Sequence, residues 1–193
     1  RPMLGSYGAI TLLNHVHVAQ GRSRWGWLAA TAVASGFSIW ATHFIAMLAF
    51  SPDGPTGYDF VLTLLSLVAA IAVTGFAYFA AIDGSWPMRA LGGALVGLGI
   101  ATMHYTGMAA FSVAGFIVWH ENLVAASIAL GCALGAAALV VGTGNTTLLH
   151  RLQGALLLTL AIFSLHFTAM GAASIVRDPT IMVAGSAIPP GLM

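Results

Sequence analysis

The chain of 193 residues alternates six long apolar runs with short segments rich in Gly, Pro, Asp and Ser. A helix needs roughly 20 apolar residues to cross a bilayer, and these runs have about that length. The intervening clusters, such as Ser51-Pro52-Asp53-Gly54-Pro55 and Gly142-Thr143-Gly144-Asn145, are typical of turns. The pattern predicts an all-α bundle of six transmembrane helices, with approximate bounds 2–19, 25–50, 58–82, 87–110, 121–141 and 149–175.

A short motif recurs in the second, fourth and sixth runs. Each copy has a His, an aromatic residue, two smaller residues and a Met. The copies are Thr42-His43-Phe44-Ile45-Ala46-Met47, Met103-His104-Tyr105-Thr106-Gly107-Met108 and Leu165-His166-Phe167-Thr168-Ala169-Met170. The histidines lie 61 and 62 residues apart, from 104 − 43 and 166 − 104. This period predicts a single domain, residues 1–193, built from three helical hairpins at about 1–50, 58–112 and 121–175.

The composition supports a membrane protein and excludes several other classes. Hydrophobic residues make up 59% of the chain and charged residues 6%, whereas soluble domains contain about 25% charged residues. The net charge of +1 gives no reason to expect contact with nucleic acid. The single Cys132 cannot support a disulfide framework. Residues 178–193 are too short to span a bilayer, and we expect them to lead into a seventh helix outside this segment.

The charged residues predict an orientation for the bundle. Arginines follow the first, third and fifth predicted helices, and acidic residues follow the second and fourth. They are Arg22, Arg24, Arg89 and Arg151 in the first group, and Asp53, Asp59 and Glu121 in the second. Arg177, which follows the sixth helix beside Asp178, is an exception to this pattern. Since arginines favour the cytoplasmic side, the three His-Met motifs are expected in the outward half of the membrane.

The spacing within the motif predicts a metal site. A His and a Met four residues apart lie on one face of a helix, one turn from each other. If the three faces converge, the candidate ligands are His43, Met47, His104, Met108, His166 and Met170. Imidazole and thioether together suit copper, as Cu(I) or Cu(II). Zinc could use the three imidazoles alone, and haem also takes His and Met but needs them on opposite sides of its ring.

A structural explanation of the motif competes with the metal site. A His inside a membrane can serve as a hydrogen-bonding residue between helices, and Met commonly fills space in cores. Duplication of a hairpin would copy such a packing motif. Three copies with the same offset favour the metal site, because a polar side chain in lipid is costly and tends to be functional.

Met103-His104-Tyr105-Thr106 spells the sequence MHYT, and the chain resembles the bacterial MHYT sensor domain over essentially its whole length. That family has three motif copies near the outer ends of alternating membrane helices. The copies at His43 and His166 depart from the MHYT spelling but keep the His, the aromatic residue and the Met.

The resemblance implies a multi-pass sensor of the bacterial inner membrane. Such domains are usually fused to cytoplasmic output modules, such as diguanylate cyclases, phosphodiesterases, histidine kinases or DNA-binding domains. The implied ligand is a diatomic gas (O2, CO or NO), or a change of redox state, sensed through copper at the six His and Met positions. The segment itself shows no catalytic set of residues, so we expect enzymatic activity only in a fused module.

Three alternatives remain open from the sequence. A copper transfer or transport protein would need a path of metal ligands across the whole membrane. A haem-binding subunit of a membrane oxidoreductase would show an intense absorption band. A purely structural helical anchor would bind no metal.

Overall fold

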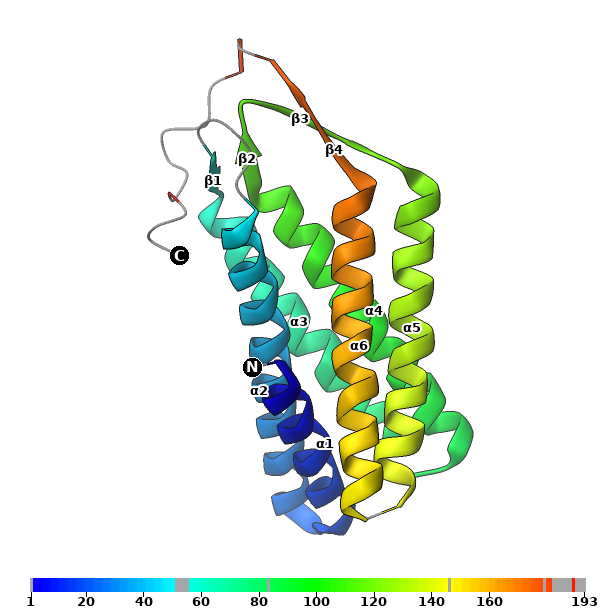
Figure 1. Cartoon of the computed structure of the whole chain (residues 1–193). Coiled ribbons are helices and arrows are strands. Elements are labelled where there is room, and N and C mark those ends of the chain that lie inside the picture. The colour runs from blue at the N-terminus through cyan, green and yellow to red at the C-terminus, as the bar shows by residue number, and fades with distance from the viewer. Residues whose placement is uncertain are drawn as a thin grey trace.

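The computed structural model describes residues 2–50, 56–82, 84–145, 147–178, 180–181 and 189. Within these residues it is an all-α bundle of six helices, as predicted (Figure 1). The helices are α1 (Pro2–Val18), α2 (Gly21–Ala49), α3 (Phe60–Ala81), α4 (Trp86–Ala110), α5 (Glu121–Gly144) and α6 (Leu148–Ala172).

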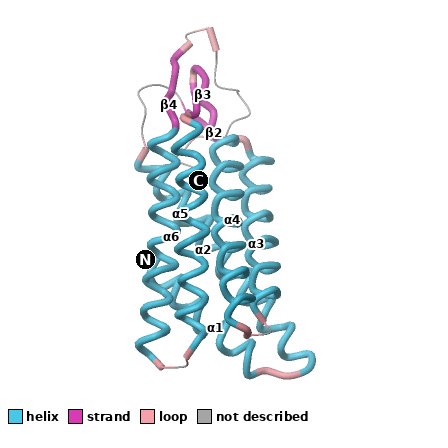
Figure 2. Tube along the Cα trace, turned by 90° about the vertical axis from the view of Figure 1, so that its right-hand side faces the viewer, coloured by secondary structure: helices cyan, strands magenta, loops and turns pink. Residues whose placement is uncertain are grey.

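The helices form three antiparallel hairpins in chain order. The connections within each hairpin lie together at one end of the bundle, drawn at the bottom of Figure 1, and the strands lie at the opposite end. The side view shows the same separation (Figure 2). Arg22, Arg89 and Arg151 belong to the end with the connections. We call this the inner end and the end with the strands the outer end.

Local sequence explains where several helices begin. The Asp59 carboxylate accepts a hydrogen bond from the backbone N–H of Leu62 at 2.8 Å, so α3 begins at Phe60 rather than at residue 58. The Thr147 side chain caps α6 in the same way. Pro87 occupies the first turn of α4, where its missing N–H costs no helical hydrogen bond.

Among the described residues, four helices are long and apolar enough to cross a membrane: α2, α3, α5 and α6. The helix α1 has 17 residues, and α4 is long enough but less apolar. The lower apolarity of α4 has a physical reason. This helix packs against α3 and α5 and also contacts α2 and α6. A helix surrounded by protein meets little lipid, so it can carry many glycines and a histidine.

Short strands at the outer end were not predicted. The strand β1 (Thr56–Tyr58) pairs with β2 (Phe111–Val113), and β3 (Gly115–Trp119) pairs with β4 (Ala173–Arg177). The prediction of helix up to residue 175 was therefore wrong by three residues, because Ala173 and its successors find strand partners in the segment after α4. The predicted turn at 51–55 and most of the tail after residue 181 lie outside the described residues.

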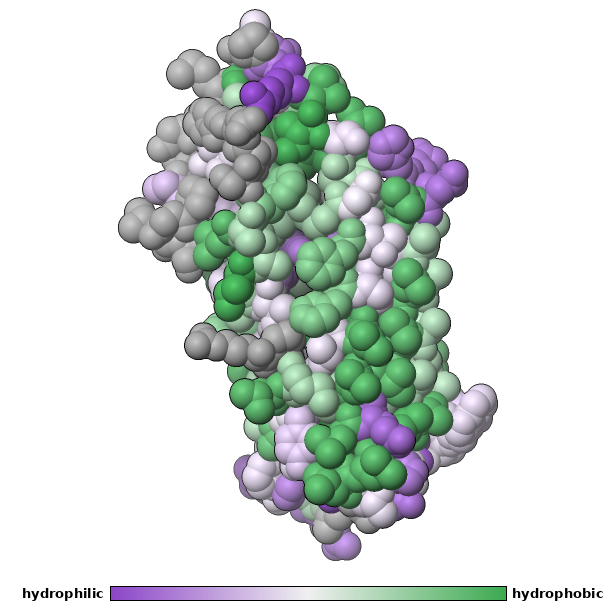
Figure 3. All heavy atoms as spheres, viewed as in Figure 1, coloured by the Kyte–Doolittle hydropathy of each residue, from purple (hydrophilic) through white to green (hydrophobic). Residues whose placement is uncertain are grey.

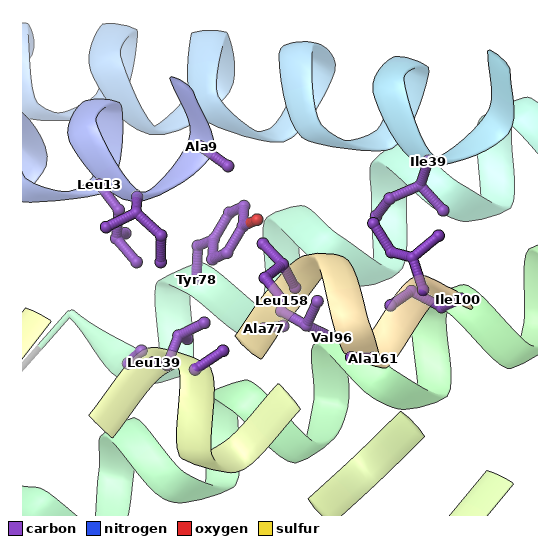
Figure 4. Packing of buried hydrophobic residues seen from close by; sticks show 14 of the residues in the cluster. Ala9, Leu13, Ile39, Ala77, Tyr78, Val96, Ile100, Leu139, Leu158 and Ala161 are labelled. Carbon is purple, nitrogen blue, oxygen red and sulfur yellow. The ribbon is translucent and has the colours of Figure 1, made fainter. Parts of the chain in front are cut away.

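Buried side chains form two apolar clusters. The larger fills the inner and middle parts of the bundle around the fully buried Tyr78, and Ile39 and Ile100 meet at one end of it (Figure 4). The smaller cluster lies toward the strands and consists of Phe44, Met47, Tyr58, Met108 and Phe111. The boundary between the two clusters is where the motif histidines lie.

Candidate metal centre

Three helices bring the motif histidines to one point. The Nδ1 atom of His43 on α2 lies 3.2 Å from Nδ1 of His104 on α4 and 3.4 Å from Nδ1 of His166 on α6. One ring nitrogen from each of the three residues lies within 4.8 Å of the others. Their side chains are only 3%, 1% and 8% exposed. The three histidine-bearing helix faces therefore meet, as the predicted metal site requires.

The arrangement fits a single metal ion. Three imidazoles bound at about 2.0–2.1 Å around one tetrahedral or trigonal ion place their nitrogens about 3.3–3.6 Å apart. The distance of 3.4 Å falls within this range and the distance of 3.2 Å lies just below it. The three ring centroids are 4.9, 5.2 and 5.4 Å apart, so the site is nearly symmetric. The buried Nε2 atoms of His43 and His104 have no hydrogen-bond partner among the described residues, so the polar contacts of these two rings are those between the Nδ1 atoms.

Each motif occupies the same place on its helix. In α2, α4 and α6 the residue after the last turn donates its backbone N–H to the carbonyl of the motif Met. Each of these caps lies seven residues after its histidine, at Phe50, Phe111 and Ala173. The histidines are therefore level with one another, and three helix C-termini point to the outer end, where their partial negative charge favours cations.

The motif methionines lie one turn further out than the histidines. Met47 and Met108 are buried in the smaller apolar cluster, and Met170 packs against it. Tyr58 is a buried member of this cluster, and burial raises its pKa to about 12, so its phenol stays neutral. The structure thus brings the methionines together above the histidines, while ligation by their sulfurs remains a prediction.

Below the level of the histidines and that of the methionines lies a third set of equivalent residues, which the sequence did not predict. Ile39, Ile100 and Ile162 each lie four residues before a motif histidine, and all three are buried in the larger cluster. They repeat at the same intervals of 61 and 62 residues as the histidines, so extending the motif by one turn would have found them. They close the inner side of the histidine layer with apolar surface.

A glycine makes room for one of the histidines. A Cβ atom at Gly107 on α4 would lie 2.7 Å from Nε2 of His43. The equivalent positions in the other copies are Ala46 and Ala169. All three copies therefore have a small residue at this position, and on α4 it lets the His43 imidazole approach.

Other residues with candidate roles lie outside this centre. The Tyr105 hydroxyl is 2.7 Å from Ser127 Oγ on α5, so it links two helices instead of reaching a histidine. Met103 is buried in the larger cluster. His15 contacts the Thr11 carbonyl oxygen at 2.9 Å, and His120 lies 3.3 Å from Ser174 Oγ. His15 and His120 therefore make local contacts at opposite ends of the bundle.

Comparison with known proteins agrees with the repeat. Residues 36–94 and 97–155 match the MHYT family, described as the N-terminal repeat of bacterial signalling proteins. Each matched segment begins seven residues before a motif histidine, His43 or His104. No solved structure matches this chain.

Full-length relatives are much larger than this chain. It is 39% identical over 193 residues to an uncharacterized signalling protein of Caulobacter vibrioides, covering 99% of this chain and 24% of that protein. It is 41% identical over 178 residues to the bifunctional diguanylate cyclase/cyclic di-GMP phosphodiesterase MucR of Pseudomonas aeruginosa, covering 89% and 26%. The cyclic di-GMP phosphodiesterase NbdA of the same organism is 37% identical over 178 residues, covering 88% and 22%. The chain spans about a quarter of the length of these relatives.

The repeat spacing, the three level histidines and the match over two consecutive segments lead to one assignment. The chain belongs to the MHYT family of bacterial signalling proteins.

Proposed function

We propose that this segment is a membrane-embedded sensing domain that binds one copper ion near the outer face. His43, His104 and His166 hold the ion, with Met47, Met108 and Met170 as the candidate thioether ligands. The signal is a diatomic gas (O2, CO or NO) or a change of redox state. The observation that carries the proposal is the convergence of the three Nδ1 atoms in a buried, nearly symmetric site.

The chemistry of the surroundings favours copper, and Cu(I) in particular. A bound imidazole or thioether carries no charge. The smaller apolar cluster has no Asp, Glu, Lys or Arg among its described members. Burying charge without a counter-charge is expensive, so a monovalent ion is easier to accommodate than a divalent one. Soft thioethers also select Cu(I). Bound copper would supply a coordination position for a diatomic molecule and a change of oxidation state.

The layers around the site favour sensing over transport. The three isoleucines below the histidines carry no ligand atom, and Met103 is the one thioether among the described residues of the larger cluster, so no continuous path of ligands leads toward the inner end. Haem fits poorly, because three imidazole nitrogens within 4.8 Å of one another leave no space for a porphyrin between them. An ion held here would stay near the outer face.

The helices offer a route for the signal. α2, α4 and α6 run without interruption from the histidine layer to the inner end, so a rearrangement of the imidazoles would displace the inner ends of these helices. Such coupling requires the liganded and unliganded states to differ in free energy. By similarity to MucR and NbdA, the fused output module acts on cyclic di-GMP in the cytoplasm. The domain then resides in the bacterial inner membrane, with its histidines toward the periplasm.

Elemental analysis of the purified full-length protein, with an absorption spectrum of the same sample, tests the metal assignment. We expect about one copper ion per chain and no haem band. His104→Ala should abolish copper binding, because it removes one of three converging ligands. His150→Ala is the matched control, since His150 lies at the inner end and contacts Thr147 instead. Undiminished copper in His104→Ala would refute the assignment.

A further inference from the structure

A pocket of about 370 Å³ lies at the outer end of the bundle, between the end of α4 and the chain that joins α4 to α5. Its walls come from one continuous and fully described stretch, residues 105–119. In Figure 1 this stretch crosses from the end of α4, through β2 and β3, to the start of α5. Ala109 and Phe116 on the walls are exposed, so the pocket opens at the surface of the molecule.

The walls of this pocket offer a soft sulfur and the faces of aromatic rings. Met108 lines it and also belongs to the smaller apolar cluster, together with Met47. Tyr105 and Trp119 also line it, as an edge-to-face pair whose ring centroids are 5.3 Å apart. Thioethers select Cu(I), and the faces of Trp and Tyr attract cations. These walls therefore suit a soft monovalent cation.

The electrostatic surroundings also favour a cation. The C-terminus of α4 lies at the pocket and contributes a partial negative charge. No charged side chain lines the pocket. Among the described residues, the outer end carries three carboxylates and one arginine: Asp59, Glu121, Asp178 and Arg177. Figure 3 shows hydrophilic side chains gathered where α5 begins, at this end. An excess of negative charge raises the local concentration of cations.

The pocket continues to the histidines through the methionine layer. Met108 lies four residues after His104 on α4, which is about 6 Å along the helix axis. Trp119 and Met170 both pack against the cluster that contains Met47. A cavity of about 30 Å³ borders all three histidines, between α2, α4 and α6. Since one water needs about 10–15 Å³ measured in this way, an ion has room beside the rings.

We propose that the pocket is the loading site of the metal centre, where Met108, Tyr105 and Trp119 receive Cu(I) from the periplasmic side. The ion exchanges its carrier ligands for the Met108 thioether and the two ring faces, and it keeps this thioether when it meets His104. No change of oxidation state is involved. The destination of the ion rests on the proposed copper centre, whereas cation binding in the pocket does not need the histidines.

Uptake kinetics of the metal-free, full-length protein in lipid nanodiscs test this site. Cu(I) is offered without oxygen as its bicinchoninate complex, whose colour fades as the protein takes up copper. Trp119→Leu should slow uptake roughly fivefold, because it removes a cation–π contact from the receiving site, and should reach the wild-type copper content. Trp119→Phe keeps a ring face and should restore most of the rate. Trp86→Leu, the same type of change at an exposed residue of the inner end, should leave the rate unchanged.

A second variant and a second ion keep the test decisive. Ala109→Phe fills the pocket from an exposed position, so it should slow uptake even if Trp119→Leu folds poorly. Equal uptake rates in wild type, Trp119→Leu and Ala109→Phe would overturn the loading site.

Ag(I), another soft monovalent ion, tests the pocket without the histidine centre. In His104→Ala, Ag(I) should quench the part of the tryptophan fluorescence that disappears when Trp119→Leu is added. A lack of this quenching would also overturn the loading site. Quenching in a wild-type protein that holds no copper would instead refute the metal assignment alone.

Discussion

His43 shows how one residue position can depend on another helix. Its Nδ1 contacts both of the other histidines, while its Nε2 lies against Gly107 of α4. The position of this imidazole is therefore set by the absence of a side chain on the neighbouring helix. Gly107, in the motif copy of α4, makes room for His43 of α2. This relation cannot be seen in the sequence of one motif copy alone.

Gly107→Ala should weaken metal binding. The added methyl group would lie 2.7 Å from His43 Nε2, so the ring must move and its Nδ1 leaves the shared centre. Disturbing the groups that orient a metal ligand typically costs about 10–100-fold in affinity, and we expect a loss of that size in a copper titration. Gly171→Ala on α6 is the control, because nothing lies within 4 Å of its added methyl. Equal affinities of the two variants would show that His43 does not depend on Gly107.

Among the elements, α4 has the most neighbours, and glycines let it approach one of them closely. Gly93 and Gly97 of α4 lie against the backbone of Gly135 and Gly131 of α5, so the two G-x-x-x-G patterns in the sequence pack on each other. Small residues allow such backbone contact between membrane helices. The contact fixes α4 between α3 and α5, and with it the position of His104.

Gly97→Ala should destabilise the bundle through this contact. A Cβ atom there would overlap the backbone of Gly131 and Cys132, which cannot move as a flexible side chain can. Overpacking of this kind costs about 1–3 kcal/mol, measured as the free energy of unfolding in mixed detergent. Gly26→Ala on α2 has open space around it and should cost much less. A Gly97→Ala protein as stable as Gly26→Ala would mean that the α4–α5 contact is looser than the structure indicates.

For the whole molecule, the three hairpins place the connections that carry Arg22, Arg89 and Arg151 at one end and the candidate metal centre nearer the other. The helices that carry the histidines all run toward the outer end, because each is the second helix of its hairpin. Three equivalent hairpins therefore give three level histidines without any symmetry between separate chains.

Cysteine labelling tests the orientation of this arrangement. In a Cys132→Ser background, Phe116→Cys introduces a thiol in β3 and Leu149→Cys introduces one at the inner end of α6, where the native side chains are 50% and 62% exposed. With arginines in the cytoplasm, a membrane-impermeant maleimide added to intact cells should label Phe116→Cys alone. Leu149→Cys should react only after the membrane is opened. The reverse pattern would place the histidines on the cytoplasmic side.

The sequence alone determined the approximate extent of the helices, the hairpin repeat and the choice of candidate ligand residues. Apolar length locates each helix to within a few residues, and the period of 61 and 62 residues is visible in the chain. The turn predicted at 142–145 was wrong, because Gly142, Thr143 and Gly144 form the last turn of α5. The offset of four residues between His43 and Met47 already places both on one helix face. These features depend on neighbours in sequence, and therefore need no knowledge of packing.

Only the tertiary structure decided whether the three faces meet. Convergence depends on the depth at which α2, α4 and α6 lie and on their rotation, which glycine contacts such as Gly97 with Gly131 set. The strands had no clear local pattern, because β2 and β4 form only where distant segments supply hydrogen bonds. The small cavity beside the histidines likewise belongs to no single segment, since its walls come from α2, α4 and α6, which are far apart in the chain.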